Sequence, residues 1–250
     1  MSQDWFGARG LRDPAPVRLF CLAHAGGGGS FFRSWRELLT PDVAVVPVIL
    51  PGRESRSRER PYRRMADLVE ALAASLTPHL DRPFALFGHS MGAAVAFETA
   101  HLLARGNGPR PRRLFVSGRR PPTMPSRRPD LHRLPDDQFI DAVARMGGTP
   151  PELLRRRELL DVFLPRLRAD FEVNETYQPG PRTRLSCPVS AFTGDTDPEV
   201  DALEMAAWQS VTDGEFVLRV FRGGHFYLVD AAVPLTRVIL AELQATPVGP

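Results

Sequence analysis

The chain has 250 residues, a length typical of one domain that buries a substantial core. A hydrophobic content of 43% and a charged content of 24% exclude a disordered chain, and no apolar run approaches the ~20 residues of a membrane helix. The N-terminus also lacks the apolar core of a signal peptide, so we expect a cytoplasmic protein without a membrane partner. Cys21 and Cys187 fall in or beside expected buried strands, which favours packed free thiols over a disulfide or a metal site.

Charge is unevenly distributed, although the net charge is only +3. The basic side chains are all arginine, and many of them fall in residues 53–64 and 105–133. Neither stretch carries interleaved aromatic residues or a motif that reads nucleic acid, so we expect no nucleic-acid partner. Two interpretations remain open, a solvated arginine-rich face and a docking face for an acidic protein.

Hydrophobic patterning predicts alternating strands and helices in the first half of the chain. Residues 1–16 are polar and contain proline and glycine, so we expect a loose arm. The elements after it are strands at 17–23, 43–50, 84–87 and 114–117, and helices at 31–39, 65–80 and 91–105. Strand, helix and strand at this spacing indicate right-handed parallel crossovers.

A helical segment interrupts this alternation between residues 118 and 187. Three amphipathic stretches, at 135–146, 151–160 and 162–177, each predict a helix. Because α/β active sites lie at the carboxyl ends of the strands, we interpret residues 119–187 as a helical lid over those ends, with a small separate domain as the alternative.

Strands at 188–193 and 215–221 and helices at 200–211 and 235–243 complete the chain. We therefore expect an α/β fold with a mostly parallel central sheet flanked by helices. Its parts are an N-terminal arm (1–16), a core (17–118 and 188–250) and the lid insertion (119–187).

The turn Gly88-His-Ser-Met-Gly92 lies between a buried strand and a helix rich in small residues. A sharp turn at such a junction holds the Ser90 hydroxyl clear of the backbone, and the flanking glycines let neighbouring chain segments approach closely. This is the pattern of the nucleophile elbow of α/β-hydrolases. Five residues alone fit equally an ordinary junction whose serine caps the helix.

A base and an acid for Ser90 follow in the order Ser, Asp, His that α/β-hydrolases use. Asp197 and His225 each lie in a loop directly after an expected strand, and such loops converge on one edge of the sheet. We therefore predict a catalytic triad of Ser90, Asp197 and His225. Asp195 remains an alternative acid because it lies in the same loop, whereas Asp201 is expected to belong to the next helix.

The glycine run after the first strand, His24 to Ser30, has two possible uses. A phosphate cradle would need a P-loop lysine, which is absent, and the Rossmann glycine spacing is not matched. In an α/β-hydrolase this loop supplies one N–H of the oxyanion hole and the residue after the nucleophile supplies the other, so we predict Ala25 and Met91 as donors. We expect His24 to line the pocket, and His89 to be a packed or hydrogen-bonded histidine.

Taken together, these motifs resemble the type II thioesterases that act in trans beside polyketide synthases and non-ribosomal peptide synthetases. The resemblance spans nearly the whole chain after the arm, and its residues 50–56 and 165–170 are more specific to that family than the elbow. The matching segments are His24-Ala-Gly-Gly27 with Phe31-Phe-Arg-Ser-Trp35, Leu50-Pro-Gly-Arg-Glu-Ser-Arg56, Gly88-His-Ser-Met-Gly92, Ser117-Gly-Arg-Arg-Pro-Pro122, Gly147-Gly-Thr-Pro150, Pro165-Arg-Leu-Arg-Ala-Asp170, Gly194-Asp-Thr-Asp-Pro198 and Gly223-Gly-His-Phe226.

The resemblance implies an α/β-hydrolase fold and the same assignment of triad and oxyanion donors. It also implies hydrolysis of stalled or wrongly primed acyl groups from the phosphopantetheine thiol of acyl or peptidyl carrier proteins, by a monomer without metal or free cofactor. Because carrier proteins are generally acidic, the arginine-rich stretches then become a possible docking face. In that case, charge reversal at Arg119 and Arg120 raises KM for carrier-bound substrates and spares a small acyl thioester.

Three other functions remain compatible with the sequence. A serine esterase would use the same triad on oxygen esters, and an acyltransferase would pass the acyl group to an alcohol or an amine. A non-catalytic carrier-binding module could keep the fold, but such a module has no need of an intact triad.

Overall fold

The structure is a computed structural model that describes residues 5–105, 108–147, 157–180 and 183–245. Its centre is a six-stranded sheet in the order β2-β1-β3-β4-β5-β6, in which every neighbouring pair is parallel. The strands are β1 (Val17–Leu22), β2 (Val43–Pro47), β3 (Phe84–His89), β4 (Leu114–Ser117), β5 (Val189–Gly194) and β6 (Phe216–Phe221). The prediction of a parallel α/β sheet is therefore confirmed.

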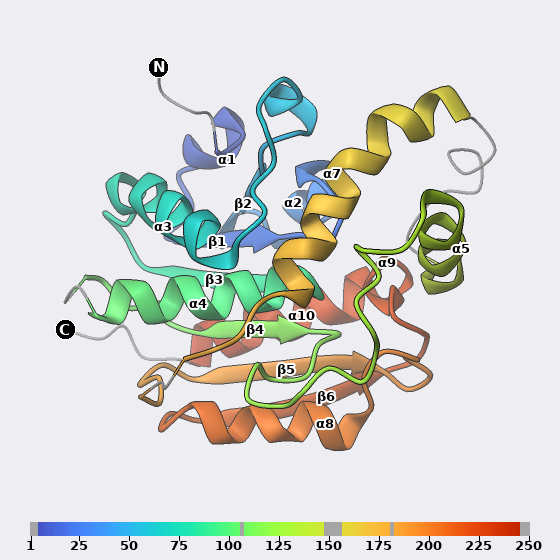
Figure 1. The fold of residues 1–250 in the computed structure, drawn as a ribbon. Coiled ribbons are helices and arrows are strands. Elements are labelled where there is room, and N and C mark those ends of the chain that lie inside the picture. Colours follow the sequence, from blue (N-terminus) through green and yellow to red (C-terminus); the bar gives the residue numbers. More distant parts are fainter. Residues whose placement is uncertain (1–4, 106–107, 148–156, 181–182, 246–250) are drawn as a thin grey trace.

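Helices cover both faces of the sheet, which is why β1, β3 and β5 are buried at every position. One face packs against α3 (Met65–Leu76), α4 (Met91–Arg105) and α8 (Ala202–Ala206). The other packs against α2 (Arg33–Leu39) and α10 (Ala232–Ala245). In Figure 1, α3 and α4 lie in front of the sheet and α10 lies behind it. The short elements are α1 (Ala8–Leu11), α9 (Tyr227–Asp230) and the 3₁₀ turns η1 (Gly29–Phe32), η2 (Glu54–Arg56), η3 (Thr77–His79) and η4 (Ala207–Val211).

The N-terminal segment is packed where the structure describes it. Trp5 and Phe6 are only 1% and 3% exposed, and Phe6 forms a β-bridge with Val48. The Arg56 guanidinium lies 4.1 Å above the Trp5 ring. The expectation of a loose arm is therefore wrong for residues 5–16, because two large apolar side chains bury themselves against the edge of the sheet.

Two helices, α5 (Asp136–Met146) and α7 (Arg157–Glu175), occupy the segment between β4 and β5, and we call residues 119–187 the helical insertion. The predicted helix at 135–146 matches α5. The predicted break before Val162 is wrong, because α7 is continuous there and runs on through Pro165, which removes one backbone hydrogen bond without ending the helix. Residues 151–156 of the predicted helix at 151–160 lie outside the described residues.

The helical insertion has an apolar cluster of its own, formed by Leu131, Phe139, Ala142, Val143, Phe163, Leu164, Leu167 and Phe171. Arg168 connects its parts, since its guanidinium donates to Leu134 O and Asp136 and lies 4.4 Å above the Phe139 ring. In Figure 1, α7 runs diagonally with α5 to its right. The cluster also contacts Ala25 of the core, so α7 packs directly on the loop after β1.

Cys21 and Cys187 are buried free thiols, as predicted, and burial raises the pKa of both. Among the helices that the structure describes, none has the length and apolarity needed to cross a membrane.

Candidate active site

Ser90 lies at the sharp turn between β3 and α4. Its backbone has a φ of +55°, and its N–H donates to Ser117 O at 2.8 Å. A Cβ atom at Gly88 would lie 2.1 Å from Gly92 O, and one at Gly92 would lie 2.3 Å from Leu22 O. Only glycine fits at both positions. This left-handed serine between two obligatory glycines is the geometry of a nucleophile elbow, whereas a helix-capping serine has an extended backbone.

His225 and Asp197 form a hydrogen-bonded pair in the loops after β6 and β5. The His225 Nδ1 atom lies 2.9 Å from Asp197 Oδ2 and 3.1 Å from Oδ1. Asp197 Oδ1 also accepts the Glu199 N–H at 2.8 Å, and the Asp197 side chain is fully buried. This carboxylate fixes the orientation of the imidazole and leaves its Nε2 atom available for a second partner.

The two other aspartates of this region have different partners. Asp195 Oδ1 accepts the Gly223 N–H at 2.8 Å, so it shapes the loop that carries His225. Asp201 caps α8 in a reciprocal capping box with Glu204, as its position beside a predicted helix indicates. Of the three aspartates in this loop region, Asp197 alone hydrogen-bonds to the imidazole, which favours it over Asp195.

Ser90 and His225 open into the same cavity, which has a volume of about 750 Å³. This lies within the ~300–1,000 Å³ range usual for small-molecule sites. Its walls come from the loop after β4, the C-terminal half of α7 and the loop after β5. They include Gly118, Arg119, Pro121, Met124, Leu131, Phe171, Asn174, Tyr177 and Pro198.

The predicted oxyanion donors follow neighbouring strands. Ala25 comes after β1 and Met91 comes after β3, and the strand order reverses between these two strands, where ligands bind in open α/β sheets. Ala25 lies in a turn closed by a hydrogen bond from Gly27 N to His24 O at 2.9 Å. Gly26, the third residue of this turn, has a φ of +79°, which favours glycine.

Two further histidines pack beside His225. The His89 Nδ1 atom lies 2.9 Å from Ser117 Oγ, as expected for a hydrogen-bonded histidine, and the centre of its ring lies 4.9 Å from that of His225. The His24 ring packs between Phe31 and Phe226 rather than against the cavity.

Burial keeps both of these imidazoles neutral. It lowers the pKa of His89 well below its ordinary value. Burial, followed by the nearby charges of His225 and Arg53, lowers the pKa of His24 to about 3. Neither ring therefore adds a positive charge beside His225.

The arginines of residues 120–128 are paired with acids that follow β5. Arg120 and Arg127 approach Glu204 at 3.4 and 2.8 Å, and Arg128 lies 2.6 Å from Glu199. These ion pairs join the helical insertion to α8 and to the loop that carries Asp197. They also neutralise much of the charge that the sequence suggests is available for an acidic partner.

Arg119 differs from these arginines. Its guanidinium hydrogen-bonds to the neutral side chain of Asn174, and within the described residues it has no carboxylate partner. Burial lowers its pKa to about 10. Since Arg119 also lines the cavity, it supplies a cation at the wall of the candidate site.

One group of side chains in the described residues could hold a metal ion, namely Asp130, His132 and Glu175. Both oxygens of Glu175 are already engaged, since Oε1 accepts the Leu131 N–H and Oε2 accepts both the N–H and the Nδ1 of His132. The group therefore holds the segment before α5 against the end of α7, and we assign no metal to it.

Comparisons with known proteins agree on one family. The profile of the Thioesterase domain matches residues 17–243. "Thioesterase PikA5" of Streptomyces venezuelae is 44% identical over 87% of this chain and 78% of its own length. "Gramicidin S biosynthesis protein GrsT" of Aneurinibacillus migulanus is 37% identical over 96% of this chain and 94% of its own length.

A solved structure agrees as well. The type II thioesterase BorB from the borrelidin biosynthetic cluster superposes with a TM-score of 0.87 at 35% identity, over 97% of this chain and 99% of its own. This similarity confirms the α/β-hydrolase fold.

Proposed function

The chain belongs to the thioesterase family, whose members are hydrolases of acyl thioesters, and we propose that it frees carrier proteins of stalled or wrongly primed acyl groups in polyketide or non-ribosomal peptide biosynthesis. The observation that carries the proposed chemistry is the hydrogen-bonded His225–Asp197 pair, in which His225 lines the same cavity as Ser90. The relatives' names support the biosynthetic setting.

The proposed reaction has two halves. In the first, Ser90 Oγ attacks the thioester carbonyl while His225 Nε2 takes the hydroxyl proton. The N–H groups of Ala25 and Met91 stabilise the negative oxygen that forms. The C–S bond then breaks, and the proton on His225 passes to the leaving thiol. An acyl-Ser90 ester remains.

In the second half, His225 removes a proton from water, which attacks the acyl ester. The tetrahedral intermediate collapses, Ser90 recovers its proton from His225, and the carboxylic acid leaves. Asp197 stabilises the imidazolium that forms in each half. The neutral state of His24 and His89 favours this charge, because no second cation forms beside it.

Substrate and partner complete the proposal. The substrate carries phosphopantetheine as part of an acyl or peptidyl carrier protein, and members of the family generally need no cofactor. We propose that the protein works as a cytoplasmic monomer, with α5 and α7 acting as a lid over the cavity.

The test compares one acyl group in three forms: on a carrier protein, on free pantetheine and as a simple oxygen ester. Wild type should prefer both thioesters, and Ser90→Ala should be inactive on all three while its melting temperature stays near that of wild type. Full thioesterase activity in Ser90→Ala would exclude the mechanism. A strong preference for the oxygen ester would favour a serine esterase. Acyl transfer to an added alcohol or amine in place of hydrolysis would favour an acyltransferase.

A further inference from the structure

Three segments of the sequence that are far apart meet in one buried ion pair. Asp170 of α7 is 4% exposed and Arg53, in the segment after β2, is 2% exposed. Asp170 Oδ1 lies 2.7 Å from Arg53 Nη2. The other two polar contacts reach the loop after β1: Asp170 Oδ2 accepts the Gly26 N–H at 2.7 Å, and Arg53 Nη1 donates to Gly27 O at 2.7 Å.

The contact with Gly26 has a direct structural consequence for Ala25. The N–H that Asp170 accepts belongs to the peptide between Ala25 and Gly26, the central peptide of the turn from His24 to Gly27. Turns of this kind have two arrangements that differ in the orientation of that peptide, and the positive φ of Gly26 corresponds to one of them. A carboxylate on the N–H favours the observed orientation, which fixes ψ of Ala25 and anchors the turn on which the Ala25 N–H lies.

The same turn also packs under α7. A Cβ atom at Gly26 would lie 2.7 Å from Leu167 Cδ1 and 3.0 Å from Phe163 Cζ, so α7 covers the turn without a gap. Asp170 comes from this helix, one turn after Leu167. The hydrogen bond to Gly26 therefore exists only while α7 is seated on the core.

Stability alone does not account for this arrangement. Removing two charges from water costs about as much as their attraction returns, and apolar residues of similar size often stabilise a protein as well or better. An apolar pair could fill the space of Arg53 and Asp170. It could not accept the Gly26 N–H, so the polar pair has a role that packing cannot replace.

We propose that Asp170 and Arg53 are positioning residues that hold the turn from His24 to Gly27, and with it the Ala25 N–H, in the place required for the oxyanion hole, so that this placement depends on α7 being seated. The inference rests on the proposed function, which places the Ala25 N–H at the oxyanion. A displaced α7 opens the cavity and at the same time releases the oxyanion loop, so acyl transfer to Ser90 proceeds only beneath a closed helix.

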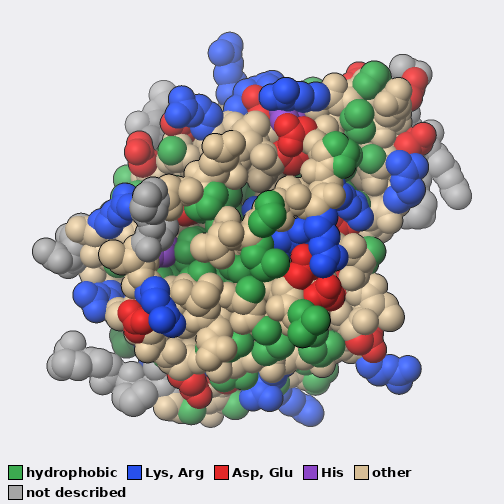
Figure 2. All heavy atoms as spheres, turned by 60° about the horizontal axis from the view of Figure 1, so that its bottom comes forward, with side chains coloured by type: hydrophobic (Ala, Val, Ile, Leu, Met, Phe, Trp, Pro, Cys, Tyr) green, Lys and Arg blue, Asp and Glu red, His purple; other side chains and the backbone are tan. Residues whose placement is uncertain are grey.

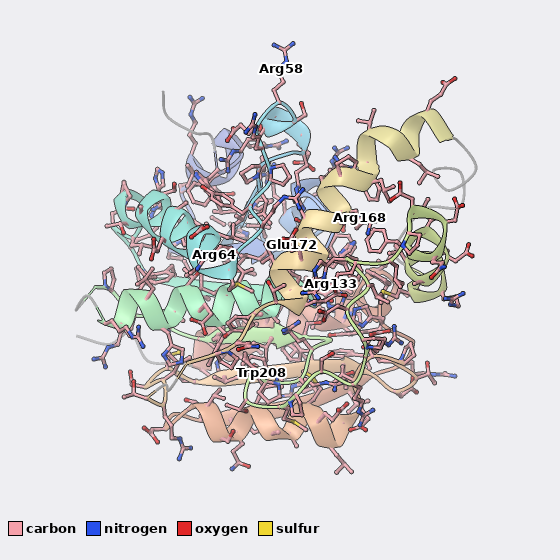
Figure 3. The ribbon with its side chains drawn as sticks, in the orientation of Figure 1. Arg58, Arg64, Arg133, Arg168, Glu172 and Trp208 are labelled. Carbon is pink, nitrogen blue, oxygen red and sulfur yellow. The ribbon has the colours of Figure 1, made fainter. Side chains whose placement is uncertain are left out.

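The test uses Asp170→Asn with Glu172→Gln as its matched control. Glu172 lies on the same helix and pairs with Arg63 of the same connecting segment. The Arg63 side chain is 61% exposed and that of Glu172 is 27% exposed, and among the described residues neither hydrogen-bonds to the turn. Figure 3 shows Glu172 on α7. The substrate is a small acyl-pantetheine. An acyl-like boronic acid forms a tetrahedral adduct with the serine, so its affinity reports how well the oxyanion hole is formed. The affinity of a thioether analogue reports binding to the cavity alone.

The single oxygen of an asparagine cannot accept from both Arg53 and Gly26, as the two oxygens of Asp170 do. Asp170→Asn should therefore lower kcat by about ten- to a hundredfold, less than the ~10²–10³ of deleting an oxyanion donor, because the Ala25 N–H is misplaced and not removed. Boronic acid affinity should fall in parallel, while KM and thioether affinity stay near wild type. Glu172→Gln should leave all four quantities unchanged. Wild-type kcat and boronic acid affinity in Asp170→Asn would overturn the proposal, and so would an equal loss of thioether affinity, which indicates general damage to the cavity.

A double variant separates this role from folding. Arg53→Met/Asp170→Leu removes both charges, so its melting temperature should recover relative to either single replacement, whereas kcat should stay low. Recovery of kcat together with stability would overturn the proposal. If wild type hydrolyses oxygen esters and not thioesters, the proposed function fails, but the same comparison read with the oxygen ester still tests the positioning role.

Discussion

The His225 Nδ1 atom lies 2.9 Å from Oδ2 of Asp197, whose side chain is fully buried. A buried carboxylate at this distance holds the imidazole in one tautomer and compensates the charge that it acquires during proton transfer. Asp197→Asn keeps the shape but loses the charge and the correct acceptor pattern. We expect kcat for an acyl-pantetheine to fall by about 10³–10⁴.

Asp195→Asn is the matched control for this prediction. Asp195 lies in the same loop but accepts a backbone N–H from Gly223, and an asparagine oxygen can accept the same bond. Its kcat should therefore stay close to wild type. Equal losses in both variants would contradict the assignment of Asp197 as the acid.

The main features of the candidate site could be predicted because each depends on local sequence. A strand followed by Gly88-x-Ser90-x-Gly92 determines the elbow, and loops that end parallel strands determine the edge where Asp197 and His225 meet. The choice between Asp195 and Asp197 is three-dimensional, because both lie in one short loop and only their orientation differs.

Contacts between distant segments could not be predicted in this way. Arg53 and Asp170 are 117 positions apart, and neither segment shows locally that its charge is buried. The sequence shows that residues 119–128 are a basic stretch. It does not show that Glu199 and Glu204 neutralise several of these arginines. Trp5 and Phe6 lie in a segment that is polar on average, so its composition does not show that these two side chains are buried against the core.

His24 should make folding stability depend on pH. Its folded pKa of about 3 lies below the ordinary value of 6.5, so between these values the unfolded state binds the extra proton. Stability from this group is fully present above pH 6.5 and is lost as the pH falls toward 3, by up to about 1.4 kcal/mol per pH unit. His89 acts in the same direction.

Urea unfolding of wild type and His24→Phe between pH 7.5 and 5 measures this dependence. Phenylalanine suits the site because the His24 ring packs between Phe31 and Phe226. In the variant, the free energy of unfolding should depend less steeply on pH, by up to the contribution of one bound proton. The contribution of His89 should remain. Identical slopes in the two proteins would show that His24 is not a buried neutral imidazole.

Arg119 allows a test of cavity binding against carrier docking. Because it lines the cavity, Arg119→Gln should raise KM on a carrier-bound and on a free pantetheine thioester by the same factor, on the order of tenfold for one charge-assisted hydrogen bond. This result differs from the docking expectation, under which the small thioester is spared. An increase in KM for the carrier-bound substrate alone would indicate that Arg119 docks the carrier protein.

The control is Arg58→Gln, because the Arg58 side chain is exposed and points away from the molecule in Figure 3. It should leave KM for the free thioester unchanged, and its effect on the carrier substrate reports surface charge alone. Figure 2 shows arginines and carboxylates intermixed on the visible face, so we expect a small effect from any single exposed arginine there.

Tyr177 should limit the length of the acyl chain. Together with Gln178 it borders both the 750 Å³ cavity and a second cavity of about 340 Å³ between α3 and α4, and its hydroxyl hydrogen-bonds to Glu98. Tyr177→Ala removes the ring from the wall between them. Chains too long for wild type should then gain kcat/KM, by up to about fourfold for each added methylene that enters the second cavity, since burying one is worth about 0.8 kcal/mol.

Tyr177→Phe keeps the ring and loses only the hydroxyl, so it should retain the wild-type chain-length profile. Measuring kcat/KM over a series of acyl-pantetheines decides the matter, and a wild-type profile in Tyr177→Ala would show that the two cavities do not connect at this residue.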